Sequence, residues 1–406
     1  MDSHNQSDSV KQNYQAQLDD LTNKYDTAVK EKMLMKLEKD RVQAKVDNLA
    51  HELLQRSKAS GDVGEGATSA HSKAKPQTKK REAFKMTGEP SNLPVKDRPN
   101  PWLSEHLEPT SSHLSCQKTF KGHLMGVTSL AYNPKKDILA TGSDDTTWKL
   151  WSIPNGDLIM SGEGHLDWIG GLDFHPRGNL LATASGDGTV KLWDFVNASC
   201  CQTWQEHGQP VWKVAFHDTG DFLLSCSMDH SVKLWDMNLK KSRFTFRGHV
   251  DSVNSISFAP YSNKFVSGSG DKTVSVWDLR VSTCVQTYYG HNNSVNCTKF
   301  DFCGEKIISS DSDGITKVWD QRMVKQIHSF DSGLTSANSC IFDKSNTNVY
   351  VASDDNTIKV FNVNSGEKEA ELKGHEDSVL DLCWDNQKEG ASLVSGGSDC
   401  SFRLWG

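Results

Sequence analysis

From residue 116 onward, apolar and polar side chains alternate in short stretches with a period of two, which is typical of β-strands. In residues 168–204, four such stretches follow one another: WIGGLDFHP, NLLATAS, TVKLWDF and SCCQTW. The tripeptide GDG and other groups of Gly, Asp and Asn separate the stretches, and these residues favour tight turns. The pattern therefore predicts consecutive antiparallel strands and no helices in this part of the chain.

The same stretches recur at a fixed spacing. An aromatic residue closes each third stretch, and successive aromatics are 42 residues apart except for a last step of 44. The aromatic positions are Trp151, Trp193, Trp235, Trp277, Trp319, Phe361 and Trp405. Six residues earlier stand Asp145, Asp187, Asp229, Asp271, Asp313, Asp355 and Asp399. A histidine stands near the start of six of the units, at His123, His165, His207, His249, His291 and His375. Seven units are therefore present.

A hydroxyl residue also recurs, ten residues before the aromatic. Its positions are Thr141, Thr183, Ser225, Ser267, Ser309 and Ser395. The sixth unit has Gly333, Val351 and Phe361 in place of histidine, hydroxyl and tryptophan. Because a half-satisfied buried network is worse than none, this joint absence predicts that the four side chains of a unit form one hydrogen-bonded network. A Ser-His-Asp hydrolase site is disfavoured, since a catalytic set occurs once and opens onto a cleft.

A unit just above forty residues, with Gly-His near its start and Trp-Asp near its end, resembles the WD40 family. Units of that family are four-stranded blades of a β-propeller. The resemblance covers residues 116–406 and implies an all-β, seven-bladed propeller. The last unit ends after its third strand, so residues 116–121 (CQKTFK) are expected to supply the fourth strand and close the ring.

The amino-terminal part of the chain follows other patterns. In residues 1–56, apolar side chains recur at alternating steps of four and three without Pro or Gly, which predicts a self-associating coiled coil. Residues 57–115 are rich in Ser, Gly, Lys and Pro and are predicted to form a flexible linker. The basic run at 72–85, SKAKPQTKKREAFK, leaves three interpretations open: a nuclear import signal, a contact for acidic tubulin surfaces, or a solvated linker.

Composition and motif spacing disfavour several kinds of binding site. The formal net charge is −7 and the ring holds more acidic than basic residues, which disfavours direct binding of nucleic acid. The stretch GSGDKT lacks the spacing of a phosphate-binding loop, and HELLQ lacks the second ligand of a zinc helix, so we expect no cofactor and no metal. Cys116, Cys200 and Cys284 share one strand position and are expected to be core thiols. Without a signal segment or a long apolar run, the chain is expected to be soluble, intracellular and not membrane-bound.

The candidate binding residues lie three and five positions after the histidine column. The residue between them is apolar and is expected to point inward, so these two positions should face the mouth of the central channel. They include Trp168, Trp212, Asn254, Asn296, Asn338 and Leu380. Two tryptophans beside an arc of asparagines resemble a protein–protein interface with an apolar centre and a polar margin. The alternative is that both indoles pack between blades.

The first two units narrow the resemblance further. KTFKGHLMGVTSLAYNPKKDILATGSDDTTWKLW and GEGHLDWIGGLDFHPRGNLLATASGDGTVKLWD are similar to the PF-twenty or sperm-associated-antigen-sixteen family of ciliary central-apparatus WD-repeat proteins. That resemblance implies a non-enzymatic scaffold with axonemal partners, located in the cytoplasm, the cytoskeleton and the cilium or flagellum. A nuclear location is left open. The alternatives are a dynein or microtubule regulator of the lissencephaly-one type, a substrate receptor of a ubiquitin ligase, and a nuclear assembly factor.

Overall fold

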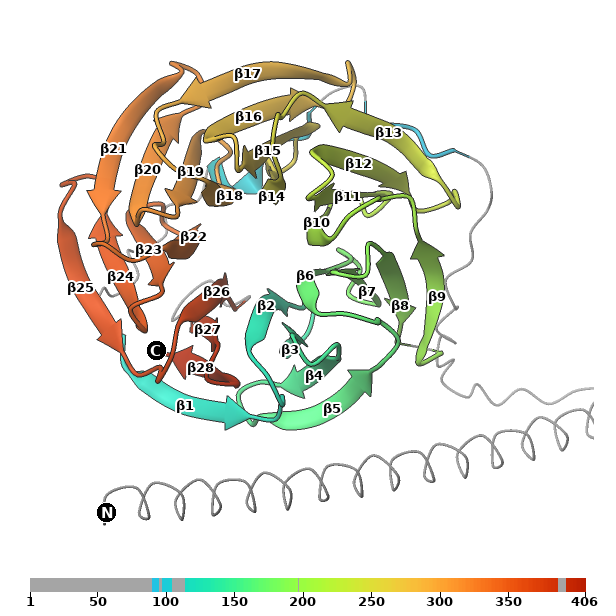
Figure 1. The fold of residues 1–406 in the computed structure, drawn as a ribbon, viewed down its shortest axis with the longest axis horizontal. Helices are drawn as coiled ribbons and strands as arrows, with labels where there is room; N and C mark the ends of the chain where they lie inside the picture. Colours follow the sequence, from blue (N-terminus) through green and yellow to red (C-terminus); the bar gives the residue numbers. More distant parts are fainter. Residues whose placement is uncertain (1–89, 95–96, 104–113, 196, 386–391) are drawn as a thin grey trace, which may run out of the picture. The chain divides into compact units, whose positions relative to one another are not determined.

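A computed structural model describes residues 90–94, 97–103, 114–195, 197–385 and 392–406. The predicted coiled coil (1–56) and the first part of the predicted linker lie outside the described residues. The described part contains strands β1 to β28, which form seven four-stranded antiparallel sheets. Figure 1 shows these sheets as blades around a central axis, so the predicted all-β, seven-bladed propeller is confirmed.

The strands of each blade are named in order from the central axis outward. Blade 1 consists of β2 (Val127–Tyr132), β3 (Ile138–Ser143), β4 (Trp148–Ser152) and β5 (Asp157–Gly162). Blade 2 consists of β6 (Ile169–Phe174), β7 (Leu180–Ser185), β8 (Val190–Asp194) and β9 (Ser199–Trp204). Blade 3 consists of β10 (Val211–Phe216), β11 (Phe222–Ser227), β12 (Ser231–Asp236) and β13 (Ser242–Arg247). Blade 4 consists of β14 (Val253–Phe258), β15 (Lys264–Ser269), β16 (Thr273–Asp278) and β17 (Thr283–Tyr289).

The remaining three blades follow the same order. Blade 5 consists of β18 (Val295–Phe300), β19 (Lys306–Asp311), β20 (Ile315–Asp320) and β21 (Lys325–Asp331). Blade 6 consists of β22 (Ala337–Phe342), β23 (Asn348–Ser353), β24 (Thr357–Asn362) and β25 (Lys368–Lys373). Blade 7 consists of β26 (Val379–Trp384), β27 (Leu393–Gly397), β28 (Ser401–Trp405) and, as its outer strand, β1 (Cys116–Lys121).

The ring closes between the two ends of the propeller. β1 pairs antiparallel with β28, as the sequence predicts, and Phe120 lies opposite Phe402 with ring centroids 4.8 Å apart. Ser115 and Gly406 exchange two backbone hydrogen bonds of 3.1 and 3.2 Å next to this pairing. Because β1 covers β28, blade 7 has the same four strands as the others and no inner strand is left unpaired.

The apolar core lies between neighbouring blades. Trp148 and Leu150 of blade 1, for example, share a buried cluster with Ile169 and Phe174 of blade 2. The blades approach so closely that a Cβ on Gly142 would lie 2.8 Å from the side chain of Ile169. Each blade therefore stabilises its two neighbours through tightly packed apolar side chains.

The outermost strand of each blade pairs with one strand only, whereas the two middle strands pair on both sides. Cys116, Cys200 and Cys284 lie in these strands and are exposed, so the expectation that they are core thiols is wrong. An outer strand has no further strand beyond it, and a repeated position there does not guarantee burial.

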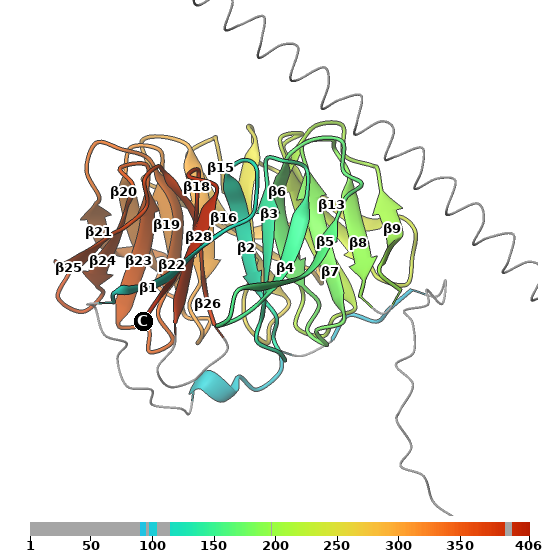
Figure 2. The same ribbon diagram turned by 90° about the horizontal axis from the view of Figure 1, so that it is seen from below.

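The two faces of the ring carry different connections. The loops that enter the blades and the turns between second and third strands lie on one face, which we call the histidine face because its loops contain the six repeated histidines. The turns between first and second strands, and between third and fourth strands, lie on the opposite face. Figure 2 shows the ring from the side, with the two sets of connections at its two edges.

Residues 90–94 and 97–103, which we call the strap, lie against the opposite face beneath blades 3 to 5 (Figure 2). At blade 3, Ser91 donates from its backbone N and its Oγ to the two carboxylate oxygens of Asp236, at 2.6 and 2.8 Å. These contacts fix the beginning of the strap.

The strap then crosses the next two blades. At blade 4, Asn263 Nδ2 donates to Pro94 O at 2.7 Å. At blade 5, Asn100 Nδ2 donates to Phe302 O at 2.8 Å, and Trp102, within the short helix η1 (Pro101–Leu103), packs against the Phe302 ring with centroids 5.4 Å apart. The strap thus contacts blades 3, 4 and 5 in succession.

The strap belongs to residues 57–115, for which the composition predicts a flexible linker. The described strap residues are held by hydrogen bonds and ring contacts, whereas the composition had suggested a solvated chain. The prolines of the segment are Pro90, Pro94, Pro99 and Pro101. Because proline restricts the unfolded chain, ordering this segment costs less conformational entropy than its polarity suggests.

Candidate functional site

The repeated polar side chains come together on the histidine face. In blade 1, His123 Nδ1 lies 2.9 Å from Asp145 Oδ2, and His123 Nε2 lies 2.7 Å from Thr141 Oγ1. Trp151 Nε1 donates to the same Oγ1 at 2.9 Å, which leaves the hydroxyl proton for Nε2 and the Nδ1–H for the carboxylate. The same contacts join His165, Thr183, Asp187 and Trp193; His207, Ser225, Asp229 and Trp235; His249, Ser267, Asp271 and Trp277; and His375, Ser395, Asp399 and Trp405.

The aspartate of each network also holds backbone in place. Asp145 Oδ2 accepts from the backbone N of Leu124, and Oδ1 accepts from the N and Oγ1 of Thr147 at 3.0 and 2.6 Å. Although burial opposes ionisation, the hydrogen bonds from His123 and Thr147 hold the pKa of Asp145 well below its usual range. The network therefore ties the loop that enters a blade to the turn within that blade.

Blade 5 departs from the predicted pattern. His291 Nδ1 lies 2.7 Å from Asp311 Oδ2, so the assignment of Asp313 to this network is wrong. Asp313 instead accepts from Asn293 Nδ2 at 2.8 Å. Asp311 stands at the buried end of β19, where the four preceding blades have serine, and its carboxylate reaches the histidine first. His291, Ser309 and Trp319 keep their predicted contacts.

Substitution of these two neighbouring aspartates is expected to give opposite results. Asp311→Ala should lower the free energy of unfolding by about 1 to 3 kcal/mol, because it leaves the buried His291 without its acceptor. Asp313→Ala should change it by less than about 0.5 kcal/mol, because that carboxylate contacts only exposed groups. Chemical denaturation of the two variants measures the difference, and equal destabilisation would contradict the revised assignment.

Blade 6 replaces the histidine network with a lysine. Lys359, which is 5% exposed, donates from Nζ to Asp355 Oδ2 and to Ser332 O. The backbone at Gly333 has φ of 104°, which favours glycine, and a Cβ there would lie 3.7 Å from Lys359 Nζ. The lysine ammonium thus lies close to the place of the missing histidine, and Asp355 keeps a partner.

The six candidate binding residues Trp168, Trp212, Asn254, Asn296, Asn338 and Leu380 all line one cavity of about 880 Å³ at the centre of the ring. Trp168 and Trp212 stack on each other with centroids 4.8 Å apart and an interplanar angle of 29°. Both indoles are partly exposed. The sequence left open whether the indoles pack between blades or face the mouth of the channel. The two rings pack against each other across blades 2 and 3 and also line the cavity.

The asparagines connect neighbouring blades. Asn254 Nδ2 donates to Val295 O at 2.9 Å, and Asn296 Nδ2 donates to Ala337 O at 3.2 Å. Asn338 Nδ2 donates to the carbonyl of the first residue of β26 at 3.0 Å. The amide donors of these asparagines are thus engaged within the ring, along an arc from blade 4 to blade 7, whereas the two indoles lie on blades 2 and 3.

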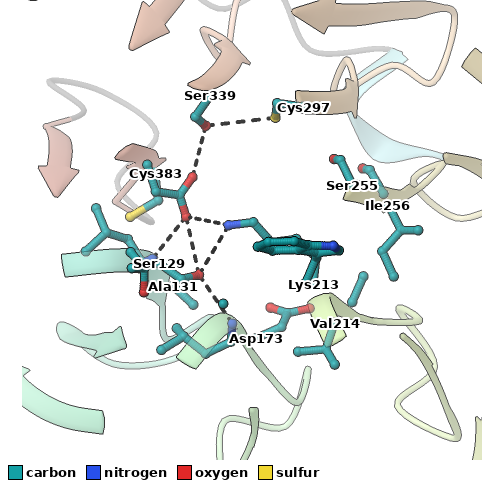
Figure 3. A pocket seen from close by; sticks show the side chains of 18 of the residues that line it. Ser129, Ala131, Asp173, Lys213, Val214, Ser255, Ile256, Cys297, Ser339 and Cys383 are labelled. Atoms are coloured by element: carbon teal, nitrogen blue, oxygen red, sulfur yellow. Dashed lines mark hydrogen bonds and ion pairs between the residues drawn. The ribbon is translucent and has the colours of Figure 1, made fainter. Parts of the chain in front are cut away.

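Charged side chains also line this cavity, among them Lys213 and Asp173, which Figure 3 labels. The buried Asp381 of blade 7 lies 3.3 Å from Lys213 Nζ of blade 3 and accepts from Ser339 Oγ at 2.9 Å. Lys299 Nζ of blade 5 donates to Leu382 O at 3.1 Å. Burial opposes ionisation of Asp381, but the charges of Lys213 and Lys299 outweigh it and lower its pKa. The channel is thus bridged between blades that are not neighbours.

Asp173 is a second carboxylate of the cavity. Asp173 Oδ2 accepts from the backbone N of Phe216 at 2.7 Å, and within the described part of the chain it forms no ion pair. Burial raises the pKa of Asp173 to about 7.

The sequence interpretation missed these channel residues. Lys213 and Asp381 stand six residues after the histidine positions, where four other units have Ser or Gly and one has Cys. A charged side chain in a column of small residues is the signal that would have found them.

Seven consecutive segments of the chain match the sequence pattern described as "WD domain, G-beta repeat". The matched residues are 114–152, 156–194, 198–236, 240–278, 282–320, 324–362 and 366–406. The chain belongs to the WD40 family. Each WD40 repeat contains the outer strand of one blade and the first three strands of the next, so repeats and blades are offset by one strand.

Relatives of this WD40 chain share part of its length. It is 42% identical over 180 residues to "Flagellar WD repeat-containing protein Pf20" of Chlamydomonas reinhardtii, a match that covers 37% of this chain and 30% of that protein. It is 37% identical over 161 residues to "Sperm-associated antigen 16 protein" of Homo sapiens, covering 35% of this chain and 26% of that protein. The resemblance to this family is confirmed, and each match spans less than a third of the relative's length.

No group of three or more His, Cys, Asp or Glu residues is placed to hold a metal ion within the described residues. No helix among them is long and apolar enough to cross a membrane.

The hydroxyl groups of the WD40 networks are buried. The hydroxyl residues Thr141, Thr183, Ser225, Ser267, Ser309 and Ser395 have no exposed surface. Each hydroxyl contacts both a histidine and an indole N–H. These groups are suited to holding loops in place.

Proposed function

We propose that this chain is a non-enzymatic protein–protein interaction scaffold of the ciliary or flagellar axoneme. The observation that carries the proposal is the use of the repeated His, hydroxyl, Asp and Trp side chains to fix the loops of one face, on which an indole pair borders the central cavity. A rigid face with partly exposed aromatic side chains is suited to binding proteins. The names of the two relatives, a flagellar protein and a sperm-associated antigen, support a flagellar setting.

Within this proposal, the partners are components of the central apparatus, and the chain supports its assembly and motility. Self-association through residues 1–56, which lie outside the described residues, would place at least two rings in one assembly. Linked rings bind a repeating filament more strongly than a single ring, because the second contact becomes intramolecular.

The proposal is tested by the double variant Trp168→Ala, Trp212→Ala, expressed as the sole copy in cells with motile cilia. Loss of both indoles should weaken binding to the partner by about 2 kcal/mol or more, which is roughly thirtyfold, and incorporation into cilia should fall accordingly. Quantitative imaging of the tagged chain along the cilium measures this.

The matched control is Val281→Ala, Met323→Ala, which removes two exposed apolar side chains from the opposite face. This control should incorporate like the parent chain. Melting temperatures of both variants establish that the ring is folded. Normal incorporation of the tryptophan variant, or turnover of a substrate by the purified chain, would contradict the scaffold.

A further inference from the structure

The histidine face presents apolar side chains at equivalent positions. The residue directly after the histidine position is Leu124, Leu166, Val250 or Leu334 in four blades, and the relative exposures of these residues are 86, 89, 83 and 104%. The backbone N of Leu124, Leu166 and Val250 donates to the network aspartate at 3.0 Å. Because the network holds the backbone in this orientation, the side chains point into solvent, and they project from the same face as the indole pair.

The same face is strongly acidic. Six of its carboxylates form no ion pair with Lys or Arg among the described residues: Asp144, Asp167, Asp251, Asp354, Glu376 and Asp377. In the seven loops that enter the blades and the seven turns after the second strands, Lys272 is the only Lys or Arg. The turns of the opposite face, by contrast, contain Lys135, Arg177, Lys240 and Arg322 among others. The charge of the ring is therefore distributed unevenly between its faces.

The acidic and apolar groups meet at blades 1 and 2. A Cβ on Gly186 would lie 2.6 Å from the Trp168 ring and 3.0 Å from the Asp167 carboxyl carbon, so both side chains lie over this glycine. Asp144 lines the cavity beside them. Burial and the charges of Asp145 and Asp167 raise the pKa of Asp144, which shows a local excess of negative charge.

From these observations we propose that the histidine face docks a cationic, partly apolar segment of a partner protein. An Arg or Lys of the segment lies beside Asp144 and Asp167, and its apolar side chains cover Leu166 and the Trp168–Trp212 pair. A cation relieves the repulsion between the carboxylates, and the adjacent indoles offer aromatic surface to the same side chain. Acidic polypeptides and nucleic acid phosphates are repelled by this face. The inference rests on the proposed function as a scaffold and adds the chemistry of the partner.

The test uses the full chain and two short fluorescent peptides, one of Arg, Leu and Ser and the other with Glu in place of each Arg. Fluorescence anisotropy should show binding of the Arg peptide alone. The double variant Asp144→Asn, Asp167→Asn should bind it about tenfold more weakly, and the difference should shrink at high salt. Trp168→Ala, Trp212→Ala should also weaken binding.

The matched control is Asp137→Asn, Asp157→Asn, which neutralises two exposed carboxylates of blade 1 on the opposite face. This control should bind the Arg peptide like the parent chain. Equal affinity of the two Asn double variants, or binding of the Glu peptide, would overturn the proposal. These outcomes are independent of incorporation into cilia, so failure of the cationic-partner proposal and failure of the scaffold proposal are distinguishable.

Discussion

Deletion of residues 116–121, which form β1, is expected to convert a monodisperse ring into aggregates. β1 is the outer partner of β28, and without it the backbone of β28 presents an unpaired edge to solvent. The deletion also removes Phe120, which stacks on Phe402 and packs against the buried cluster shared by blades 7 and 1. Size-exclusion chromatography with light scattering, together with thermal unfolding, measures the result.

A variant that keeps the strand separates these effects. Gln117→Ala, Thr119→Ala changes side chains of β1 but leaves its backbone hydrogen bonds to β28, and it should behave like the parent chain. A deletion variant that stayed monodisperse and unfolded cooperatively would show that the ring closes by another route.

Asp381→Ala is expected to lower the free energy of unfolding by about 3 to 5 kcal/mol. The substitution leaves the Lys213 ammonium in the channel without its partner and removes an acceptor from the hydroxyl of Ser339. Asp377→Ala, four residues earlier on the exposed histidine face, should change stability by less than about 0.5 kcal/mol. Denaturant titration measures both, and a similar loss for the two variants would contradict the role of the channel pair.

The pH dependence gives an independent readout of Asp381. Its pKa is lower in the folded chain than in the unfolded chain, so the ionised carboxylate contributes stability above the unfolded pKa of about 4 and loses it as the pH falls further. Asp381→Asn should remove this contribution. We therefore expect the stability difference between parent and variant to shrink on acidification, and a constant difference between pH 7 and pH 3 would contradict the linkage.

The networks of the histidine face were predictable because each lies within one repeat. His123, Thr141, Asp145 and Trp151 are close in sequence, and the same spacing recurs around the ring. Asp311 was missed because the aspartate six residues before the tryptophan is Asp313, two residues later in the chain. Only the fold shows that the earlier one ends a buried strand.

Contacts between distant repeats were not predictable. Lys213 and Asp381 are 168 residues apart, and their pairing depends on blades 3 and 7 facing the same channel. The strap was missed for a different reason, since much of it is held by hydrogen bonds involving backbone groups that composition does not encode. Sequence periodicity describes how one repeat is built, whereas these contacts follow from closing seven of them into a circle.

Because repeats and blades are offset by one strand, the first strand to be synthesised, β1, is the last to find its partner. Ser115 and Gly406, which hydrogen-bond at the closure, are 291 residues apart. At a synthesis rate of about 5 to 20 residues per second, roughly 15 to 60 s pass between the appearance of β1 and that of β28. During this interval the first strand lacks its partner, because β1 pairs with β28 alone. The ring therefore closes only after its final residues have been translated.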